Sequence, residues 1–516
     1  MRRLTLHLSL AALAGFLVTL ANARALAQDP SPQIQRPAGT SLDGPSLLWV
    51  HSSTTRAPKE MARRNRVRLK AFSWADNKTI TAYHPLRERI GGALGQPGLL
   101  AELQARARSS TGSEGSYLGS TRKLTRSALA SRDRVARLLD ENGIRGQQHN
   151  RLAEMMVWRG LAYNSSTLAH GSFGPGEPGN VELQNKARTG LVAAVRESFK
   201  LGERLGEAVR RKSGRFIRWD DLRSLQATAL KELPIKEPGE VRHFNFAAPI
   251  NSFGVHYPRL HGDSGEVHQM WLKLEQPNAK SAAERPLTFM ARTLYWLHNV
   301  HPFGDGNGRT EVLSGWSMAR ATGFPLPLEF DQGAGRFKLA ASKWGGTRTD
   351  LKRFIARGAL GTERFVKTLL PVLGRDRIES SHTDHGAVSM VTRSPEGKRH
   401  LVVMFPVNHA RQPDGELQAE ANKNRIVVTG GAFDPKGMQI NISIDGKHNP
   451  WNKVSPVAVN QWERRYPWWT TVEPIYKVRL PDNANFVDFQ VLGPGGRRVG
   501  PDNFYINLRD YDSAPF

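Results

Sequence analysis

Hydrophobic residues recur at a spacing of three to four along much of the first 373 residues, a pattern that predicts helices. The clearest stretches are 97–160, 186–232, 266–274, 286–300 and the segments leading to Leu373. Within 286–300, the residues Leu287, Met290, Leu294 and Leu297 share one stripe, and position 301 continues their spacing. We therefore expect a helix that ends at residue 301 with that position on its core side. A further helix is expected from Asn307, with Leu313 and Trp316 buried, ending near Gly323.

The pattern changes from helical to short β-rich runs after residue 375. These runs are 387–391, 400–405, 425–428, 439–444, 475–480 and 486–492. Gly, Pro, Asn and Asp separate them, which predicts an antiparallel β-sandwich. Earlier in the chain, Val241, Phe244 and Phe246 alternate with polar residues around a Pro-Ile-Asn turn, so 239–259 is predicted to form a β-hairpin.

The stretch between the two central helices, His301 to Arg309, reads HPFGDGNGR and carries the candidate chemistry. Its glycines permit a sharp turn in which backbone N–H groups converge, and a helix starting there adds the positive end of its dipole. Asp305 can bind a divalent cation, Arg309 can bind phosphate oxygens through its planar fork, and His301 can accept a proton near neutral pH. These residue types indicate transfer of a nucleotide or another phosphate-linked group. The alternative is a glycine-rich turn with a buried histidine.

This stretch resembles the signature of the Fic (Fido) family, HxFx[D/E]GN[G/K]R. The resemblance covers about residues 160–345 and implies an all-α Fic core with a β-hairpin flap that holds a target segment in extended form. It also implies a protein adenylyltransferase that uses ATP and Mg²⁺ to modify a target protein bearing a Ser, Thr or Tyr hydroxyl.

The resemblance assigns a role to each residue of the stretch. His301 is the general base, Asp305 holds Mg²⁺, and Phe303 anchors the loop. The nucleotide phosphates are bound by Gly304, Gly306, Asn307, Gly308 and Arg309.

Two positions depart from the family pattern. The family signature continues to a second arginine that holds the terminal phosphate, where this chain has Val312, expected to pack with Leu313 and Trp316. In many Fic proteins a serine-rich segment ends in an inhibitory glutamate. Ser165 to Leu168 match the start of that segment, but Ala169 or His170 occupies the position of the glutamate. The alternative for this segment is an ordinary helix end. The missing arginine leaves the donor open: ATP, UTP, or a diphosphate-linked donor such as CDP-choline.

Composition narrows the class of protein further. A chain of 516 residues suits two or three domains, and the absence of cysteine excludes disulfides and thiolate metal sites. The formal net charge of +26, or +23 without residues 1–27, favours association with an anionic surface: nucleic acid, membrane lipid or a polyanionic glycan, although the sequence shows no aromatic-interleaved nucleic-acid motif. The charge is expected to be spread along the chain and to act without sequence specificity.

The first residues have the features of an export signal. Arg2 and Arg3 precede an apolar run, and Ala25-Leu26-Ala27 forms a small-x-small cleavage site, so we expect a secreted or periplasmic protein with no transmembrane span after cleavage. The alternative is a retained membrane anchor. Delivery into another cell, as an effector or toxin, would give the enzyme access to ATP. The predicted division is a signal peptide at 1–27, a loose leader at 28–57, a helical extension at 58–159, the Fic domain at 160–374 and the β-sandwich at 375–516.

A competing hypothesis places the function in the C-terminal region. Four tryptophans gather there, and Asn449 to Asn452 is faintly similar to carbohydrate-binding sandwich modules. The tryptophans are Trp451, Trp462, Trp468 and Trp469. On this hypothesis the chain is a secreted glycan- or surface-binding protein with a relic nucleotide-binding core, although tryptophans packed in a sandwich core explain the same pattern.

Overall fold

The computed structural model describes sixteen segments of the chain from residue 121 to residue 508. They are 121–164, 179–232, 238–241, 246–250, 253–257, 278–300, 302–303, 306–329, 348–384, 387–411, 418–422, 425–430, 433–446, 453–461, 469–499 and 504–508. The predicted signal peptide, the leader, the helix at 266–274 and the segment at 165–171 lie outside these residues.

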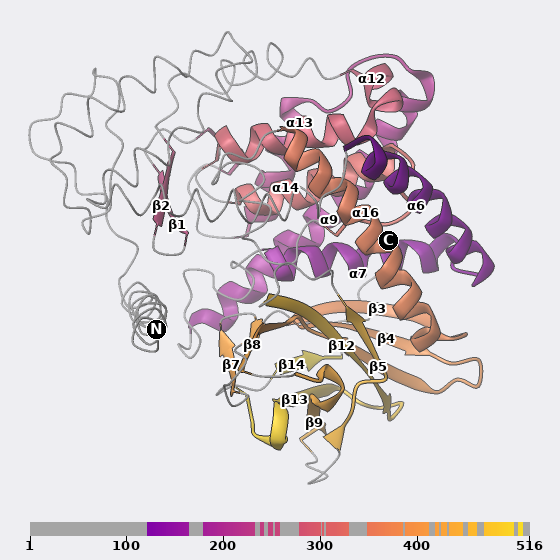
Figure 1. Cartoon of the computed structure of the whole chain (residues 1–516), viewed down its shortest axis with the longest axis vertical. Coiled ribbons are helices and arrows are strands. Elements are labelled where there is room, and N and C mark those ends of the chain that lie inside the picture. The colour runs from indigo at the N-terminus through magenta and orange to yellow at the C-terminus, as the bar shows by residue number, and fades with distance from the viewer. Residues whose placement is uncertain are drawn as a thin grey trace, which may run out of the picture.

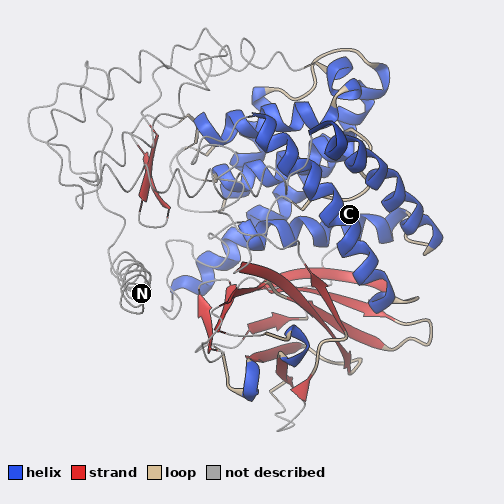
Figure 2. Cartoon of the chain, in the orientation of Figure 1, coloured by secondary structure: helices blue, strands red, loops and turns tan. Residues whose placement is uncertain are grey.

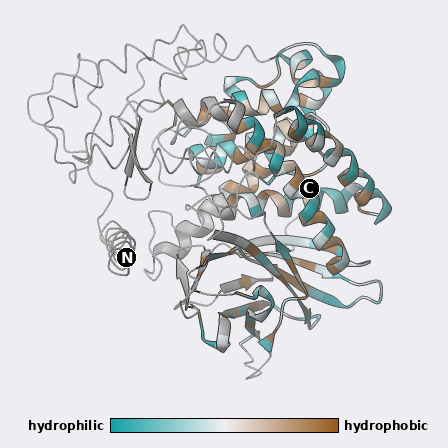
Figure 3. Cartoon of the chain, in the orientation of Figure 1, coloured by the Kyte–Doolittle hydropathy of each residue, from teal (hydrophilic) through white to brown (hydrophobic). Residues whose placement is uncertain are grey.

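Eight α-helices form one layer of the described structure (Figure 1). They are α6 (Thr121–Glu141), α7 (Gly146–Asn164), α9 (Gly179–Arg211), α10 (Trp219–Leu230), α12 (Ala279–Glu284), α13 (Pro286–Val300), α14 (Asn307–Ala321) and α16 (Arg348–Leu373). The bounds of α13 agree with the prediction, and its stripe of Leu287, Met290, Leu294 and Leu297 is buried. Figure 3 shows hydrophilic and hydrophobic positions interleaved along α6, whose buried positions follow the helical period.

Helix α14 is the centre of the helical layer. Thirteen of its fifteen residues are buried, so it has no solvent-facing stripe and must pack on all sides. Helices α7, α9, α10 and α13 surround it. Leu313 and Trp316 are fully buried, as the sequence predicts.

The β-strands form a hairpin and two larger sheets. The hairpin joins β1 (Phe246–Ile250) to β2 (Phe253–Tyr257), with Ile250 opposite Phe253. The eight-stranded sheet has the order β3 (Arg377–Asp384), β4 (Ala387–Arg393), β5 (Arg399–Met404), β12 (Trp469–Leu480), β6 (Val407–Arg411), β8 (Arg425–Gly430) and β7 (Gln418–Asn422), and β11 (Ala458–Gln461) also pairs with β12. The four-stranded sheet has the order β10 (Lys453–Val454), β9 (Gln439–Ile444), β13 (Phe486–Leu492) and β14 (Phe504–Asn507).

One strand pair departs from the predicted antiparallel arrangement. Strand β8 lies between β6 and β7 and is antiparallel to β7 but parallel to β6. The departure arises because the chain passes from β6 to the outer position of β7 and then returns between them. Sequence periodicity reports which residues are buried but not which neighbour a strand selects.

The eight-stranded sheet is the middle of three layers, with helices on one face and the smaller sheet on the other (Figure 2). Alternation along β5 shows this arrangement: Val402 and Met404 join the helical core, whereas Leu401 and Val403 join the core shared with the smaller sheet. Both faces are buried, which explains why the strand reads as a continuous apolar run. The C-terminal strands are therefore packed directly on the helices.

The described helices include none that combines the length and apolar character required to cross a membrane.

Candidate functional site

The start of α14 presents backbone N–H groups without a side-chain cap. Gly306 precedes the helix with φ 75° and ψ 6°, a left-handed conformation suited to glycine, and supplies no oxygen to the first amides. Its carbonyl accepts the first helical bond, from the Thr310 amide at 2.9 Å, and a bond of equal length from the Thr310 hydroxyl. Because the first N–H groups of a helix have no partner within it, this end of α14 is suited to an anion.

The side chain of Asn307 closes the loop that leads into α14. Its Oδ1 accepts a hydrogen bond from the Phe303 amide at 3.0 Å, and its Nδ2 donates to the Phe303 carbonyl at 2.8 Å. Both groups are buried, so the pair holds residues 303 and 307 together in one geometry. The side chain of Asn307 is thus a structural lock, and only its backbone N–H remains for a ligand.

Phe303, for which the family resemblance implies the role of loop anchor, lies in the protein core. It is fully buried and stacks on Trp219 with ring centroids 5.3 Å apart and planes 8° apart. Its backbone also pairs with Val241 in an antiparallel bridge. The loop is therefore held from α10 on one side and from the segment preceding the β-hairpin on the other.

Leu230, at the end of α10, limits the space at Gly306. A Cβ added to Gly306 would lie 3.2 Å from Leu230 Cδ1. Both the left-handed backbone and this close approach require glycine here. Trp219 and Leu230 were not expected at the site; they fall within the stretch 186–232 that was predicted to be helical, and nothing in the sequence indicated which loop they would contact.

Gly308 and Arg309 have opposite environments. Gly308 is exposed, and an added Cβ would have no atom within 4 Å. Arg309 is 2% exposed, so its guanidinium lies within the helical core. The structure brings Phe303, Gly306, Asn307, Gly308 and Arg309 together at the start of α14. His301, Gly304 and Asp305 lie outside the described residues.

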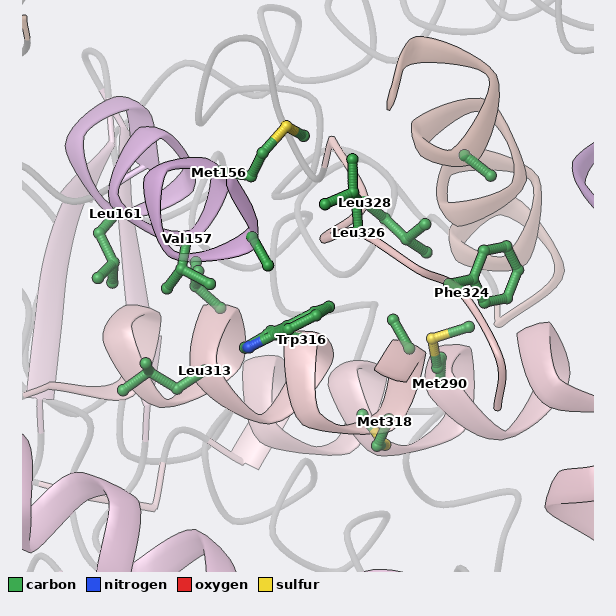
Figure 4. Close-up of a cluster of buried hydrophobic side chains, with 14 of the residues drawn as sticks. Met156, Val157, Leu161, Met290, Leu313, Trp316, Met318, Phe324, Leu326 and Leu328 are labelled. Atoms are coloured by element: carbon green, nitrogen blue, oxygen red, sulfur yellow. The ribbon is translucent and has the colours of Figure 1, made fainter. Parts of the chain in front are cut away.

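Helix α7 covers the first half of α14 (Figure 4). Val312, at the position of the second family arginine, is buried in the hydrophobic core as predicted. Its Cγ1 would be 3.3 Å from a Cβ added to Gly160 of α7. Met156, Val157 and Leu161 continue this contact toward Leu313 and Trp316 (Figure 4). An arginine at position 312 would carry its charge into this packed region.

These features define a class of helical protein in which a central buried helix begins with amides that have no side-chain cap and with an exposed glycine. Residues 217–318, which include this site, match the sequence model of the Fic/DOC family. Residues 217–318 of this chain therefore carry a Fic domain.

Two further comparisons give context. The chain is similar in structure to Fic-1 (residues 134–508) from C. elegans, with 18% sequence identity and a TM-score of 0.34 over 61% of this chain and 87% of that one. No curated protein sequence matches the chain.

Proposed function

We propose that this protein transfers AMP, or another nucleotide monophosphate, from a nucleotide donor to a hydroxyl group of a target protein. One observation carries the proposal: the uncapped amides of Asn307 and Gly308 lie at the start of a buried helix, within the segment that matches the Fic/DOC family. Amides fixed in this way stabilise the negative charge that develops on a transferred phosphoryl group without having to reorganise.

The proposed reaction assigns one step to each group. His301 takes the proton from a Ser, Thr or Tyr hydroxyl. The hydroxyl oxygen then bonds to the α-phosphorus while the bond to the β-phosphate oxygen breaks, and pyrophosphate leaves. The amides of Gly306, Asn307 and Gly308 bear the charge on the phosphate, with Gly304 completing the turn. Asp305 would hold Mg²⁺, which supplies charge neutralisation on the phosphates.

Arg309 is assigned to the phosphates beyond the transferred group. A guanidinium suits this role because it presents planar, paired donors to phosphate oxygens. Since the side chain is 2% exposed in this structure, we propose that the groups covering it move aside when the donor's outer phosphates bind.

The identity of the donor depends on Val312. Val312 is buried against α7 at the position where the family pattern has its second phosphate-binding arginine. We therefore include UTP and diphosphate-linked donors such as CDP-choline beside ATP. The absence of a carboxylate at residues 169–170 supports an enzyme without the inhibitory glutamate of its relatives.

The β1–β2 hairpin is proposed to be the flap that binds the target. Its strands offer backbone groups to which an extended peptide can add as a further strand. We further propose that residues 1–27 direct export, that the domain borders fall at 57, 159 and 374, and that the enzyme is an effector or toxin acting in another cell.

A labelling screen tests this function. The mature chain is incubated with Mg²⁺ and each α-labelled nucleotide, or with labelled CDP-choline, and label retained on protein after denaturation is measured. We expect one donor to label the chain or an added target, and His301→Ala to remove the label while the melting temperature stays unchanged. Equal labelling by the wild type and His301→Ala with every donor would refute the proposed chemistry.

A further inference from the structure

The positive charge is concentrated in the part of the sequence that precedes the C-terminal sheets. Residues 1–374 carry 55 Lys and Arg against 31 Asp and Glu, whereas residues 375–516 carry 18 against 16. The expectation of an evenly spread charge is therefore wrong. A ligand attracted by charge would meet the helices rather than the sheets.

Part of this charge gathers where α6, α16 and the α12–α13 junction meet. The Nε of Arg353 donates a hydrogen bond to Thr121 Oγ1 at 2.7 Å, which places the starts of α6 and α16 side by side. Burial lowers the pKa of Lys352, and the nearby positive charge of Arg285 lowers it further. We call Arg122, Arg126, Arg285 and Lys352 the α6–α16 basic surface.

The cations of this surface are not neutralised by the described part of the protein. None of the four forms an ion pair with a described residue, whereas Arg132 and Arg134, further along α6, pair with Asp133 and Glu363. By sequence, the acids closest to them in described helices are Glu284, which is exposed, and Asp350, in the first turn of α16. By sequence, the segments preceding α6 and α16, residues 101–120 and 330–347, contain five basic and three acidic residues, so they add no excess of acid.

The stability of α6 does not explain why Arg122 and Arg126 lie close together on it. Arg122 and Arg126 are exposed and four residues apart, where like charges repel each other and destabilise a helix. Burial does not account for it either, because the helix buries the opposite stripe of Leu124, Ala128 and Ser131. An external anionic partner is the physical reason that remains.

The chemistry of the surface favours a nucleic-acid backbone over a lipid bilayer. Three of the four cations are arginines, whose planar fork matches phosphate oxygens, and they lie on several elements rather than in one pocket. Among the described residues, Val457 is the exposed large hydrophobic side chain, and it lies in the sheet region. The described residues of the α6–α16 basic surface therefore offer no apolar side chain that could enter a membrane.

We propose that the α6–α16 basic surface binds the phosphate backbone of duplex nucleic acid without reading its sequence. Helix α6 lies across the molecule from the β1–β2 hairpin (Figure 1), so the surface is separate from the place where a target segment would bind. This inference does not depend on the donor or on transfer activity.

The test measures binding of a fluorescent 20-base-pair DNA duplex to the mature full-length chain by anisotropy at several salt concentrations. The variant Arg122→Gln/Arg126→Gln/Arg285→Gln should weaken binding at least about tenfold. It should also lower the slope of log K against log salt by about 2 to 3, since each lost phosphate contact removes about 0.9. A duplex of unrelated sequence should bind equally well.

The matched control removes the same charge from exposed positions of the sheet region, as Lys436→Gln/Arg479→Gln/Arg497→Gln. It should change the affinity less than twofold, and both triple variants should melt within a few degrees of the wild type. Equal weakening by the two triple variants would show that net charge alone drives binding and would overturn the proposal. Absence of duplex binding at low salt, with or without binding to phosphatidylserine vesicles, would overturn it as well.

Discussion

Arg159 of α7 donates two hydrogen bonds to Glu473 of β12, at 2.8 and 2.7 Å, across the boundary between helices and sheet. The side chains are 3% and 0% exposed. Arg159 also donates to Glu329 at 2.7 Å and lies 4.1 Å from the centre of the Phe365 ring. The α7 helix that covers the first half of α14 is thus fixed to the C-terminal sheet by a buried charged group.

Removing the central cation should strongly destabilise the fold. Arg159→Met leaves Glu329 and Glu473 buried together without their shared partner, and breaking a buried pair in this way costs about 3–5 kcal/mol. Denaturant unfolding measures the loss. We also expect the helical and sheet signals to remain in one transition in the wild type, because the two parts share this network.

A matched variant separates this network from ordinary surface pairs. Arg211→Met removes an exposed pair with Glu207 on α9 and should change the unfolding free energy by less than about 1 kcal/mol. Equal effects of the two variants would contradict a structural role for the buried network.

The two glycines at the start of α14 should respond differently to alanine. Gly306→Ala forces a left-handed alanine against Leu230 and should cost about 1–3 kcal/mol of stability. Gly308→Ala adds a methyl group to open space in a helical turn, so its stability should be unchanged or raised by about 0.4–1 kcal/mol.

Alanine at position 308 should be tolerated by the fold but should weaken donor binding. The alanine methyl group would occupy the exposed side of the first turn, where the phosphate of the proposed donor approaches the amides. Donor binding should therefore weaken while the fold remains intact. Nucleotide titration of the Gly308→Ala variant, beside its melting curve, checks this. Unchanged nucleotide affinity would place the ligand elsewhere.

Asn307 should be required for the shape of the loop. Asn307→Ala removes both hydrogen bonds to the Phe303 backbone and leaves buried polar groups unsatisfied, at a cost of about 1–3 kcal/mol each. Asn307→Asp keeps the acceptor for the Phe303 amide but loses the donor to its carbonyl. Both variants should therefore be less stable than the wild type when unfolding is measured at pH 7, and wild-type stability of either would argue against the lock.

Glu154 of α7 should make stability depend on pH. Burial raises the pKa of its carboxyl to about 7, although the Trp158 indole and nearby Arg196 and Arg151 act in the opposite direction. The folded protein therefore binds a proton that the unfolded chain releases near pH 4.5. This contribution favours folding below that pH and is lost progressively as pH rises toward 7.

The variant Glu154→Gln tests this assignment. It should remove the unfavourable contribution at pH 8, raising the unfolding free energy by at most about 3 kcal/mol relative to the wild type, with little effect near pH 4.5. Urea unfolding at both pH values measures the difference. An equal change at the two pH values would assign the effect to packing instead.

The sequence predicted much of the order of elements. The bounds of α13, the start of α14 and the hairpin followed from periodicity and turn residues, because these signals are local. The strands β3, β6, β7, β10, β11 and β14 were missed, because most of them are short or polar and carry no run of apolar residues. The parallel pairing of β6 and β8 was also missed. Strand pairing depends on the path that the chain takes between strands rather than on the local pattern of residues.

The sequence by itself determined the resemblance to the Fic family and the chemical types within HPFGDGNGR, because this stretch combines a proton acceptor, a carboxylate, glycines and an arginine within nine residues. The tertiary structure decided what holds that loop: Asn307 bonded to Phe303, Trp219 stacked beneath it and Leu230 against Gly306. It also decided that Arg159 would join helices to sheet across 314 positions of sequence. Such partners come from distant parts of the chain, and they are selected only when burial brings complementary groups into contact.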